Sequence, residues 1–160
     1  MNGDMNYRID QRREAVIAAI RAGELPQLVI HDQLRKEMKF NRAFRLREFC
    51  EGALDFAPTY KYDRRSDEFD SSEKARTPAW CDRVLWRSQM PERVEQLFYR
   101  RWEPNVSDHR PISSGFRMAV KSVKKDARER VKLEMAERWK SVERSLLSSA
   151  RQYYIDQQLI

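Results

Sequence analysis

From Lys121 onward, apolar residues recur every three or four positions, and neither glycine nor proline interrupts them. Such spacing matches the period of an α-helix, so we predict one helix of about 38 residues, on the order of 55 Å long. The chain should therefore divide into a first part, residues 1–118, and a basic amphipathic helical extension, residues 119–160. The recurring positions are Val123, Ala127, Val131, Met135, Trp139, Val142, Leu146, Ala150 and Tyr153.

Positive charge is concentrated in this extension. The chain has 32 Lys and Arg against 25 Asp and Glu, a net charge of +7, and from Ala119 onward ten face six. A surplus of this size implies an anionic partner, and nucleic acid, an anionic membrane and a phosphorylated small molecule all qualify. The helix could pack on the first part, bind a partner helix, or lie on anionic lipid. Its interspersed acidic residues make lipid the weakest of the three.

The composition indicates a folded protein of the cytosol. Seventeen aromatic residues need burial, and the only cysteines, Cys50 and Cys81, form no C-x-x-C pair. The start of the chain does not resemble a signal peptide, and every apolar run is far shorter than a bilayer. We therefore expect reduced thiols, a cytoplasmic location and at most peripheral contact with membranes.

The first part predicts two helices followed by strands. One helix is capped by Asp10 and stopped by Gly23, and a second runs from Pro26 to Phe40. A buried strand then begins near Leu54 and ends in a polar loop over residues 63–77. Three further strands are expected at residues 79–86, 94–102 and 111–120, with Pro111 at a strand start, where a missing backbone donor is tolerated.

Three separate segments carry residues suited to phosphate-ester hydrolysis. That reaction needs an activated water, donors for the phosphoryl oxygens and compensation of charge on the leaving oxygen, usually by a divalent metal. Asp4 and Asn6 lie two apart, so on an extended segment they point to one side. Asp82 follows in a predicted strand, and His109 lies in a later loop. A carboxylate bonded to one imidazole nitrogen fixes the tautomer and aims the other nitrogen at substrate.

These segments also carry a family resemblance. "GDMNYRI" and "PAWCDRVLW" resemble the two signature motifs of the inositol polyphosphate 5-phosphatases. "FAPTYKYD", "SEKAR" and "SDHRPISSGF" resemble the intervening and closing segments, in the same order over roughly residues 3–118. The resemblance implies an α/β fold: part of the two-sheet sandwich of the Mg-dependent endonuclease/exonuclease/phosphatase superfamily, flanked by helices. The helical extension is similar to that of fungal synaptojanin-like members.

The resemblance also assigns roles by position. Asp4 would activate or orient the attacking water, and Asn6 would hold that water and a phosphoryl oxygen. His109, oriented by Asp82, would bind and stabilise the phosphoryl group, and either Asp4 or His109 would move the proton. Asp108 would lie near the metal, Mg²⁺. The neighbouring 4-phosphate of the inositol ring would be gripped by Tyr60, Lys61, Lys74 and Arg76, and arginine forks suit phosphate oxygens.

Three functional hypotheses follow. The first is a phosphoric monoester hydrolase that removes the 5-phosphate of phosphatidylinositol 4,5-bisphosphate or soluble inositol polyphosphates at a membrane surface. The family's catalytic domain is longer, however, and the glutamate that binds Mg²⁺ precedes the first motif. The second hypothesis is therefore a truncated, catalytically incompetent fragment that retains phosphate or partner binding and aggregates or pairs through open sheet edges. The third is a nuclease of the same superfamily, which the 4-phosphate clamp disfavours, so no nucleic acid partner is expected.

Several prominent side chains are expected to be structural. Trp80 and Trp86 should pack in the core, and Cys81 lacks any feature that would lower its pKa. Arg8 is expected to act as scaffold rather than as a phosphate contact. Arg83 should alternate away from Asp82 along the strand, which places it at the surface or as a support for that carboxylate.

Overall fold

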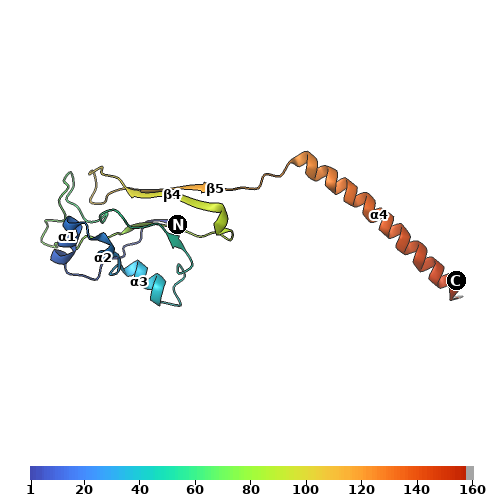
Figure 1. Ribbon diagram of the computed structural model, residues 1–160, viewed down its shortest axis with the longest axis horizontal. Helices are drawn as coiled ribbons and strands as arrows, with labels where there is room; N and C mark the ends of the chain where they lie inside the picture. Colours follow the sequence, from blue (N-terminus) through green and yellow to red (C-terminus); the bar gives the residue numbers. More distant parts are fainter. Residues whose placement is uncertain (158–160) are drawn as a thin grey trace. The chain divides into compact units, whose positions relative to one another are not determined.

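The computed structural model describes residues 1–157 and divides them into two compact units that meet between Ala119 and Val120. The first unit holds two small antiparallel sheets with three short helices, and the second is essentially one helix (Figure 1). The predicted α/β class with two sheets and a long C-terminal helix is confirmed. In order, the elements are β1 (Asn2–Asp4), α1 (Arg13–Ala22), α2 (Leu25–Val29), α3 (Gln33–Phe40), β2 (Cys50–Glu51), β3 (Asp82–Trp86), the 3-10 turn η1 (Pro91–Arg93), β4 (Val94–Arg101), β5 (Ile112–Met118) and α4 (Lys125–Asp156).

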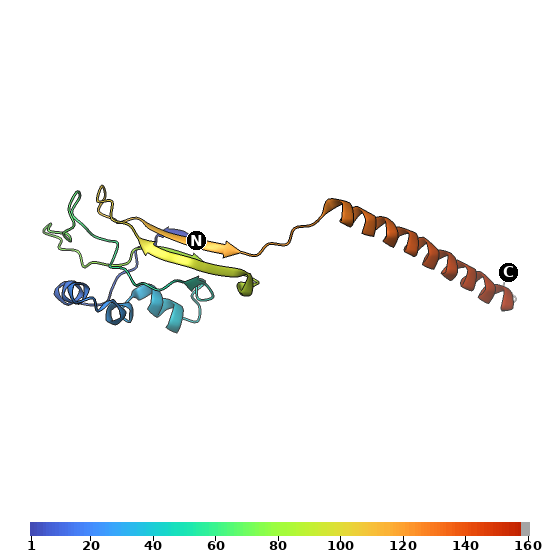
Figure 2. The same cartoon turned by 45° about the horizontal axis from the view of Figure 1, so that its top comes forward.

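The three-stranded sheet has β3 at its centre, with β1 and β2 antiparallel on either side. Its register places Asp4 opposite Asp82. The second sheet is the β4–β5 hairpin, whose register shifts between Gln96 and Phe98. In both views of the chain, the three short helices lie together on one side of this hairpin (Figures 1 and 2).

The helix predictions are partly wrong. Gly23 ends α1 as predicted, with a left-handed φ of 73°. Asp10 does not cap α1, which begins after Arg12. Its carboxylate instead accepts hydrogen bonds from the side chains of Gln33 (2.7 Å) and Lys36 (2.8 Å), which tie this segment to α3.

The second predicted helix is interrupted. It separates into α2 and α3 because Asp32 is extended and caps α3 by accepting a 2.9 Å bond from the N–H of Arg35. An aspartate at this position ends one helix and starts the next, since its side chain competes for backbone donors.

The buried strand predicted near Leu54 is also wrong. The segment forms only isolated bridges, which pair Tyr60 with Ala79 and with His109, and Tyr62 with Phe69. Pro58, which lacks a backbone N–H, lies inside the segment and cannot donate to a ladder. The two-residue strand β2 lies just before it and was not predicted.

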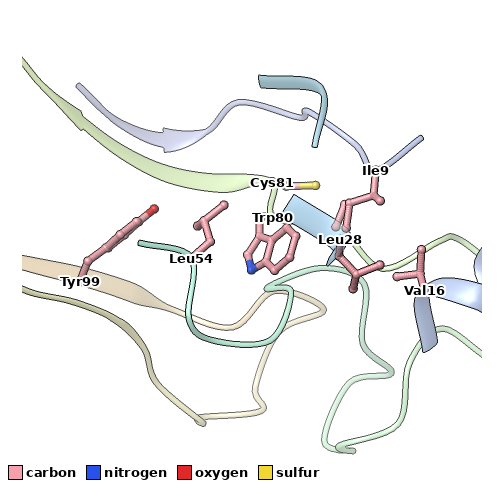
Figure 3. Close-up of a cluster of buried hydrophobic side chains, with 8 residues drawn as sticks. Ile9, Val16, Leu28, Leu54, Trp80, Cys81 and Tyr99 are labelled. Atoms are coloured by element: carbon pink, nitrogen blue, oxygen red, sulfur yellow. The ribbon is translucent and has the colours of Figure 1, made fainter. Parts of the chain in front are cut away.

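Trp80 lies at the centre of the core, with no exposed surface (Figure 3). Its indole N–H donates to the carbonyl of Phe56 at 2.8 Å, so its one polar atom is satisfied. Burying a side chain of this size removes roughly 150–250 Å² from water, worth about 4–6 kcal/mol before entropic costs. This confirms the structural role predicted for Trp80. The cluster is completed by Ile9, Val16, Leu28, Leu54, Ala79, Cys81 and Tyr99.

A buried ionic network crosses the other face of β3. Arg83 is fully buried, so of the two positions predicted for it the one at the surface is wrong. Its guanidinium donates to both oxygens of Glu51 (2.6 and 2.8 Å) and to both oxygens of Asp32 (2.9 Å each). Burial raises the pKa of Asp32, although the nearby Arg83 charge opposes that rise. The network connects the centre of the sheet to β2 and to the start of α3.

Helix α4 has 32 residues and no buried side chain. It is somewhat shorter than predicted, and residues 158–160 lie outside the described part of the chain. Its apolar stripe is exposed, with Met135 and Trp139 at 65% and 68% exposure. None of the described helices is long and apolar enough to cross a lipid bilayer.

Candidate active site

The centre of the candidate site is a carboxylate–imidazole pair. Asp82 is the first residue of β3, and His109 lies in the loop before β5. His109 Nδ1 lies 2.9 Å from Asp82 Oδ2, and Thr59 Oγ1 donates to the same oxygen at 2.7 Å. Because an ionised carboxylate only accepts, Nδ1 carries the proton and Nε2 is left for a ligand. Thr59 was not predicted, although it immediately precedes Tyr60.

Three carboxylates act on this imidazole. The hydrogen bond to Asp82 is the main cause that raises the pKa of His109 above its ordinary value, and partial burial opposes the rise. The negative charges of Asp82, Asp4 and Asp108 raise that pKa further. Residues far apart in the sequence therefore share one electrostatic environment around His109.

Asp4 reaches the site through strand register. It ends β1 directly opposite Asp82, and beyond it the N–H of Met5 donates to the carbonyl of Cys81 at 2.7 Å. Asn6 then turns the chain, with a left-handed φ of 58°, and its N–H donates to Asp4 Oδ1 at 2.9 Å. Asparagine tolerates this conformation better than most residues, so the turn suits the sequence.

A cleft of about 350 Å³ opens at this point, lined by residues of β1, β3 and the loop before β5. The structure thus brings Asp82 and His109 to one cleft, with Asp4 placed beside them by the register. Lining residues include Gly3, Asp82, Ser107 and His109.

Tyr60 and Arg8 form an adjoining stack. The Tyr60 ring lies 4.7 Å from the His109 ring, centroid to centroid, and the Arg8 guanidinium lies 4.4 Å from the Tyr60 centroid. Arg8 also donates to the side-chain oxygen of Asn6. A guanidinium over an aromatic face is an attractive arrangement. Arg8 therefore holds two predicted site residues in place, which is the scaffold role expected of it.

The three predicted cations of the clamp lie around one loop rather than against the imidazole. Lys61 Nζ lies 3.6 Å from Asp70 Oδ1, and the backbone N–H of Arg76 donates to Asp70 Oδ2 at 2.9 Å. Lys74 and Arg76 have exposed side chains. Within residues 1–157, no hydrogen bond or ion pair joins the side chains of these three cations to Asp82 or His109. Asp70 was not predicted, and its sequence signal is only that it closes the acidic stretch before "SSEKAR".

The predicted metal residue is tied into the same loop junction. The carbonyl of Asp108 accepts from the N–H of Tyr62 at 3.0 Å, and Asp108 Oδ1 lies 3.4 Å from the hydroxyl of Ser107. Among the described residues, no three His, Cys, Asp or Glu side chains come together as a complete metal site requires. Mg²⁺ commonly takes only one or two protein carboxylates and keeps several waters, so Asp108 suits such an ion as one ligand of an incomplete site.

Nucleophilic cysteine chemistry is excluded at this site. Cys81 is fully buried, and burial raises the pKa of its thiol to about 12. The thiol also donates to the carbonyl of Tyr7 at 3.6 Å. A thiol in such surroundings stays protonated near neutral pH, so Cys81 is structural, as predicted.

Comparison with known proteins identifies the family of the chain. Residues 1–115 match the sequence pattern of endonuclease/exonuclease/phosphatase family 2. The chain belongs to that family. Within the family, it is 45% identical over 123 residues to a probable inositol polyphosphate 5-phosphatase of Schizosaccharomyces pombe, a match that covers 77% of this chain and 10% of the relative. The chain therefore spans about a tenth of the length of this curated relative.

Two solved structures have a fold similar to that of this chain. The inositol polyphosphate 5-phosphatase domain of SPsynaptojanin, in complex with inositol (1,4)-bisphosphate and calcium ion, superposes with a TM-score of 0.69 and 32% identity. That match covers 93% of this chain and 42% of the other. A mutant Cimex nitrophorin, a ferrous NO complex, reaches a TM-score of 0.64 at 27% identity over 74% of this chain and 41% of its own. One fold thus serves different ligands, and function has to be argued from the site.

Proposed function

We propose that this chain is part of an inositol polyphosphate 5-phosphatase, a phosphoric monoester hydrolase that removes the 5-phosphate of phosphatidylinositol 4,5-bisphosphate-type lipids or of soluble inositol polyphosphates. One observation carries the proposal: the Asp82–His109 pair opens onto a cleft with Asp4 opposite Asp82 in the strand register. The family match and the 5-phosphatase relatives support it.

The proposed chemistry uses this geometry directly. Nε2 of His109 faces the phosphoryl oxygens, while Asp82 fixes the ring and balances its charge. Asp4 orients the attacking water with the oxygen that Asn6 N–H leaves free. The side chain of Asn6 holds that water and a phosphoryl oxygen. The proton leaves the water through Asp4 or His109, whichever lies closer to the attacking oxygen in the complex.

Substrate selection is proposed to depend on the cationic loop. A ring phosphate next to the scissile one carries nearly two negative charges, so it needs cations and hydrogen-bond donors away from the reacting bond. Lys61, Lys74 and Arg76 supply the cations, and the phenol of Tyr60, beside His109, supplies the donor nearest the reacting group.

Mg²⁺ is the proposed cation, and when bound it would compensate charge on the leaving oxygen. Asp108, whose charge already acts on His109, is the residue of this chain proposed to lie near it. Because the described residues do not form a complete metal site, the roles above are assigned to side chains of the chain alone.

The proposed place of action is the cytoplasmic surface of membranes, where the chain would bind peripherally. Its net charge of +7 favours anionic headgroups over neutral ones. The exposed apolar stripe of α4 is proposed to bind a partner protein, whereas no nucleic acid partner is proposed.

The test is phosphate release from vesicles with phosphatidylinositol 4,5-bisphosphate and from soluble inositol 1,4,5-trisphosphate, each with and without Mg²⁺. Asp4→Ala and His109→Ala should lower turnover by at least about a hundredfold, because each removes a group that acts on the reacting atoms. Lipid binding, measured by vesicle sedimentation, should remain. His31→Ala is the matched control, since His31 is the other histidine and its ring pairs with the side chain of Gln11, at 2.9 Å, rather than with a predicted site residue.

Each alternative outcome has a distinct meaning. A folded but inactive chain that still binds lipid would favour the fragment hypothesis. Cleavage of single-stranded or abasic DNA, with inositol phosphates untouched, would favour a nuclease. Loss of lipid binding together with turnover in His109→Ala would contradict the role assigned to that residue.

A further inference from the structure

Asp70 is a buried carboxylate that the proposed chemistry does not use. It is 1% exposed, and its two oxygens have separate partners. Oδ2 accepts the N–H of Arg76 at 2.9 Å. Oδ1 accepts the N–H of Ser72 at 3.2 Å and lies 3.6 Å from Lys61 Nζ. Burial alone would raise the pKa of Asp70, but the two backbone donors and the Lys61 charge lower it to about 2.

The backbone of Asp70 is fixed as well. Its N–H donates to the carbonyl of Lys61 at 3.0 Å, and its carbonyl accepts from Arg13 Nη2 at 2.8 Å. The residue is thus anchored to α1 and to the Tyr60–Lys61 segment. Its carboxylate closes the loop over residues 72–76, in which Ala75 has a positive φ of 39°. A non-glycine residue in that region persists only where its surroundings hold it.

A negative charge at this position needs an explanation. Its neighbours Lys61, Lys74 and Arg76 are the cations of the proposed clamp, and a carboxylate among them weakens their attraction for phosphate. If Asp70 acted only through its charge, its removal would strengthen phosphate binding. The hydrogen bonds to the loop indicate the opposite effect, because without them the loop would lose its shape.

We propose that Asp70 is a positioning residue. Its carboxylate fixes the loop over residues 72–76, which holds Lys74 and Arg76 beside Lys61. The three cations can then bind the ring phosphate next to the scissile one. The ligand in this inference rests on the proposed function, whereas the fixing of the loop does not. Prior ordering lowers the entropy that binding must otherwise overcome, so affinity for that phosphate depends on Asp70.

The test uses the full chain and two soluble probes in calorimetry, inositol 1,4-bisphosphate and inositol 1-phosphate, below the melting transition of each variant. Asp70→Asn should weaken binding of inositol 1,4-bisphosphate about tenfold, because it removes charge-assisted bonds to the loop. Binding of inositol 1-phosphate, which lacks the neighbouring phosphate, should be unchanged. Amide hydrogen exchange at Ser72 and Arg76 should become at least about tenfold faster.

Two controls separate positioning from charge and from stability. Glu73→Gln removes one negative charge from the same exposed loop and should leave both affinities unchanged or slightly tighter. Gly52→Ala lowers stability at a site outside the loop and should leave both probes unaffected. Asp70→Asn is used in place of Asp70→Ala because it retains the shape of the side chain and one acceptor oxygen.

The outcomes are distinct. Equal or tighter binding of inositol 1,4-bisphosphate by Asp70→Asn, with unchanged exchange at Arg76, overturns the positioning role and leaves the proposed function standing. Failure of the unmodified chain to bind inositol 1,4-bisphosphate overturns the clamp and the proposed substrate class together. Selective loss of inositol 1,4-bisphosphate binding with faster exchange supports the inference.

Discussion

Replacing Arg83 by methionine should be among the most damaging single substitutions in this protein. Methionine keeps the length of the buried stem but removes the guanidinium that donates to Glu51 and Asp32. Both carboxylates remain buried after the change. Asp32 retains the N–H of Arg35 at 2.9 Å, and Glu51 retains the Arg35 guanidinium at 3.3 Å and the Tyr99 hydroxyl at 3.2 Å. These contacts compensate only part of the lost charge.

The loss of stability expected for Arg83→Met follows from the buried carboxylate charge that is left uncompensated. Removing one partner of a buried ion pair costs about 3–5 kcal/mol, because the remaining charge is left without compensation. For a domain whose total stability is about 5–15 kcal/mol, that loss approaches the whole. Arg87→Met is the matched control, since Arg87 pairs with Glu48 at the surface with 56% of its side chain exposed. Exposed pairs contribute about 0–1 kcal/mol.

Urea unfolding followed by circular dichroism measures the free energy of unfolding lost in Arg83→Met and in Arg87→Met. The comparison holds provided that the slope of this free energy against urea concentration is unchanged. The pH dependence gives a second check. Burial already raises the pKa of Asp32, and loss of the opposing Arg83 charge in Arg83→Met should raise it further above that of the unfolded chain, so the defect is largest near neutral pH. It should shrink as the pH falls and Asp32 becomes protonated. A loss for Arg83→Met no greater than that for Arg87→Met would refute the reasoning.

Three further predictions concern other parts of the first unit. Gly52→Ala should cost about 1–3 kcal/mol in the same assay, because a Cβ there would lie 2.8 Å from the ring of Tyr99, which is buried and cannot move aside. The pKa of Asp70 is lowered from 3.8 to about 2, so this carboxylate should add about 2 kcal/mol to the free energy of unfolding above about pH 4, and the contribution should be lost as the pH falls through about 2. Asp70→Asn should remove this part of the pH dependence of stability. In thiol labelling at pH 8, Cys50, which is exposed, should react in the native protein, and Cys81 only on unfolding.

Local sequence patterns were sufficient to predict the secondary-structure elements that depend on neighbouring residues in the chain. The left-handed Gly23 at the end of α1, the strands β3 to β5 and the long helix all follow from turn residues and periodicity. The pairing of Asp82 with His109 came from motif order, because no local pattern relates two residues 27 positions apart.

Other features depended on contacts that no local pattern encodes. Alternation along β3 correctly pointed Arg83 away from Asp82, but its burial results from Glu51 and Asp32, which lie 32 and 51 residues away. The same distant contact explains why Asp32 divides the predicted second helix, since it is both a helix cap and a partner of Arg83. Asp70 was missed for a similar reason: its partners are mostly backbone N–H groups, which leave no trace in residue identity.

The alternation of β3 explains how one short strand supports both stability and chemistry. Asp82 and Val84 line the cleft and are half-buried, whereas the alternate residues Arg83 and Leu85 have no exposed surface. The position of the Asp82 carboxylate is therefore set by the network that holds Arg83, although the two side chains point apart. A shift of one residue in β3 would exchange the two faces and bury Asp82 without Thr59 and His109. The register that makes the buried network possible is thus the same register that places Asp4 beside the imidazole.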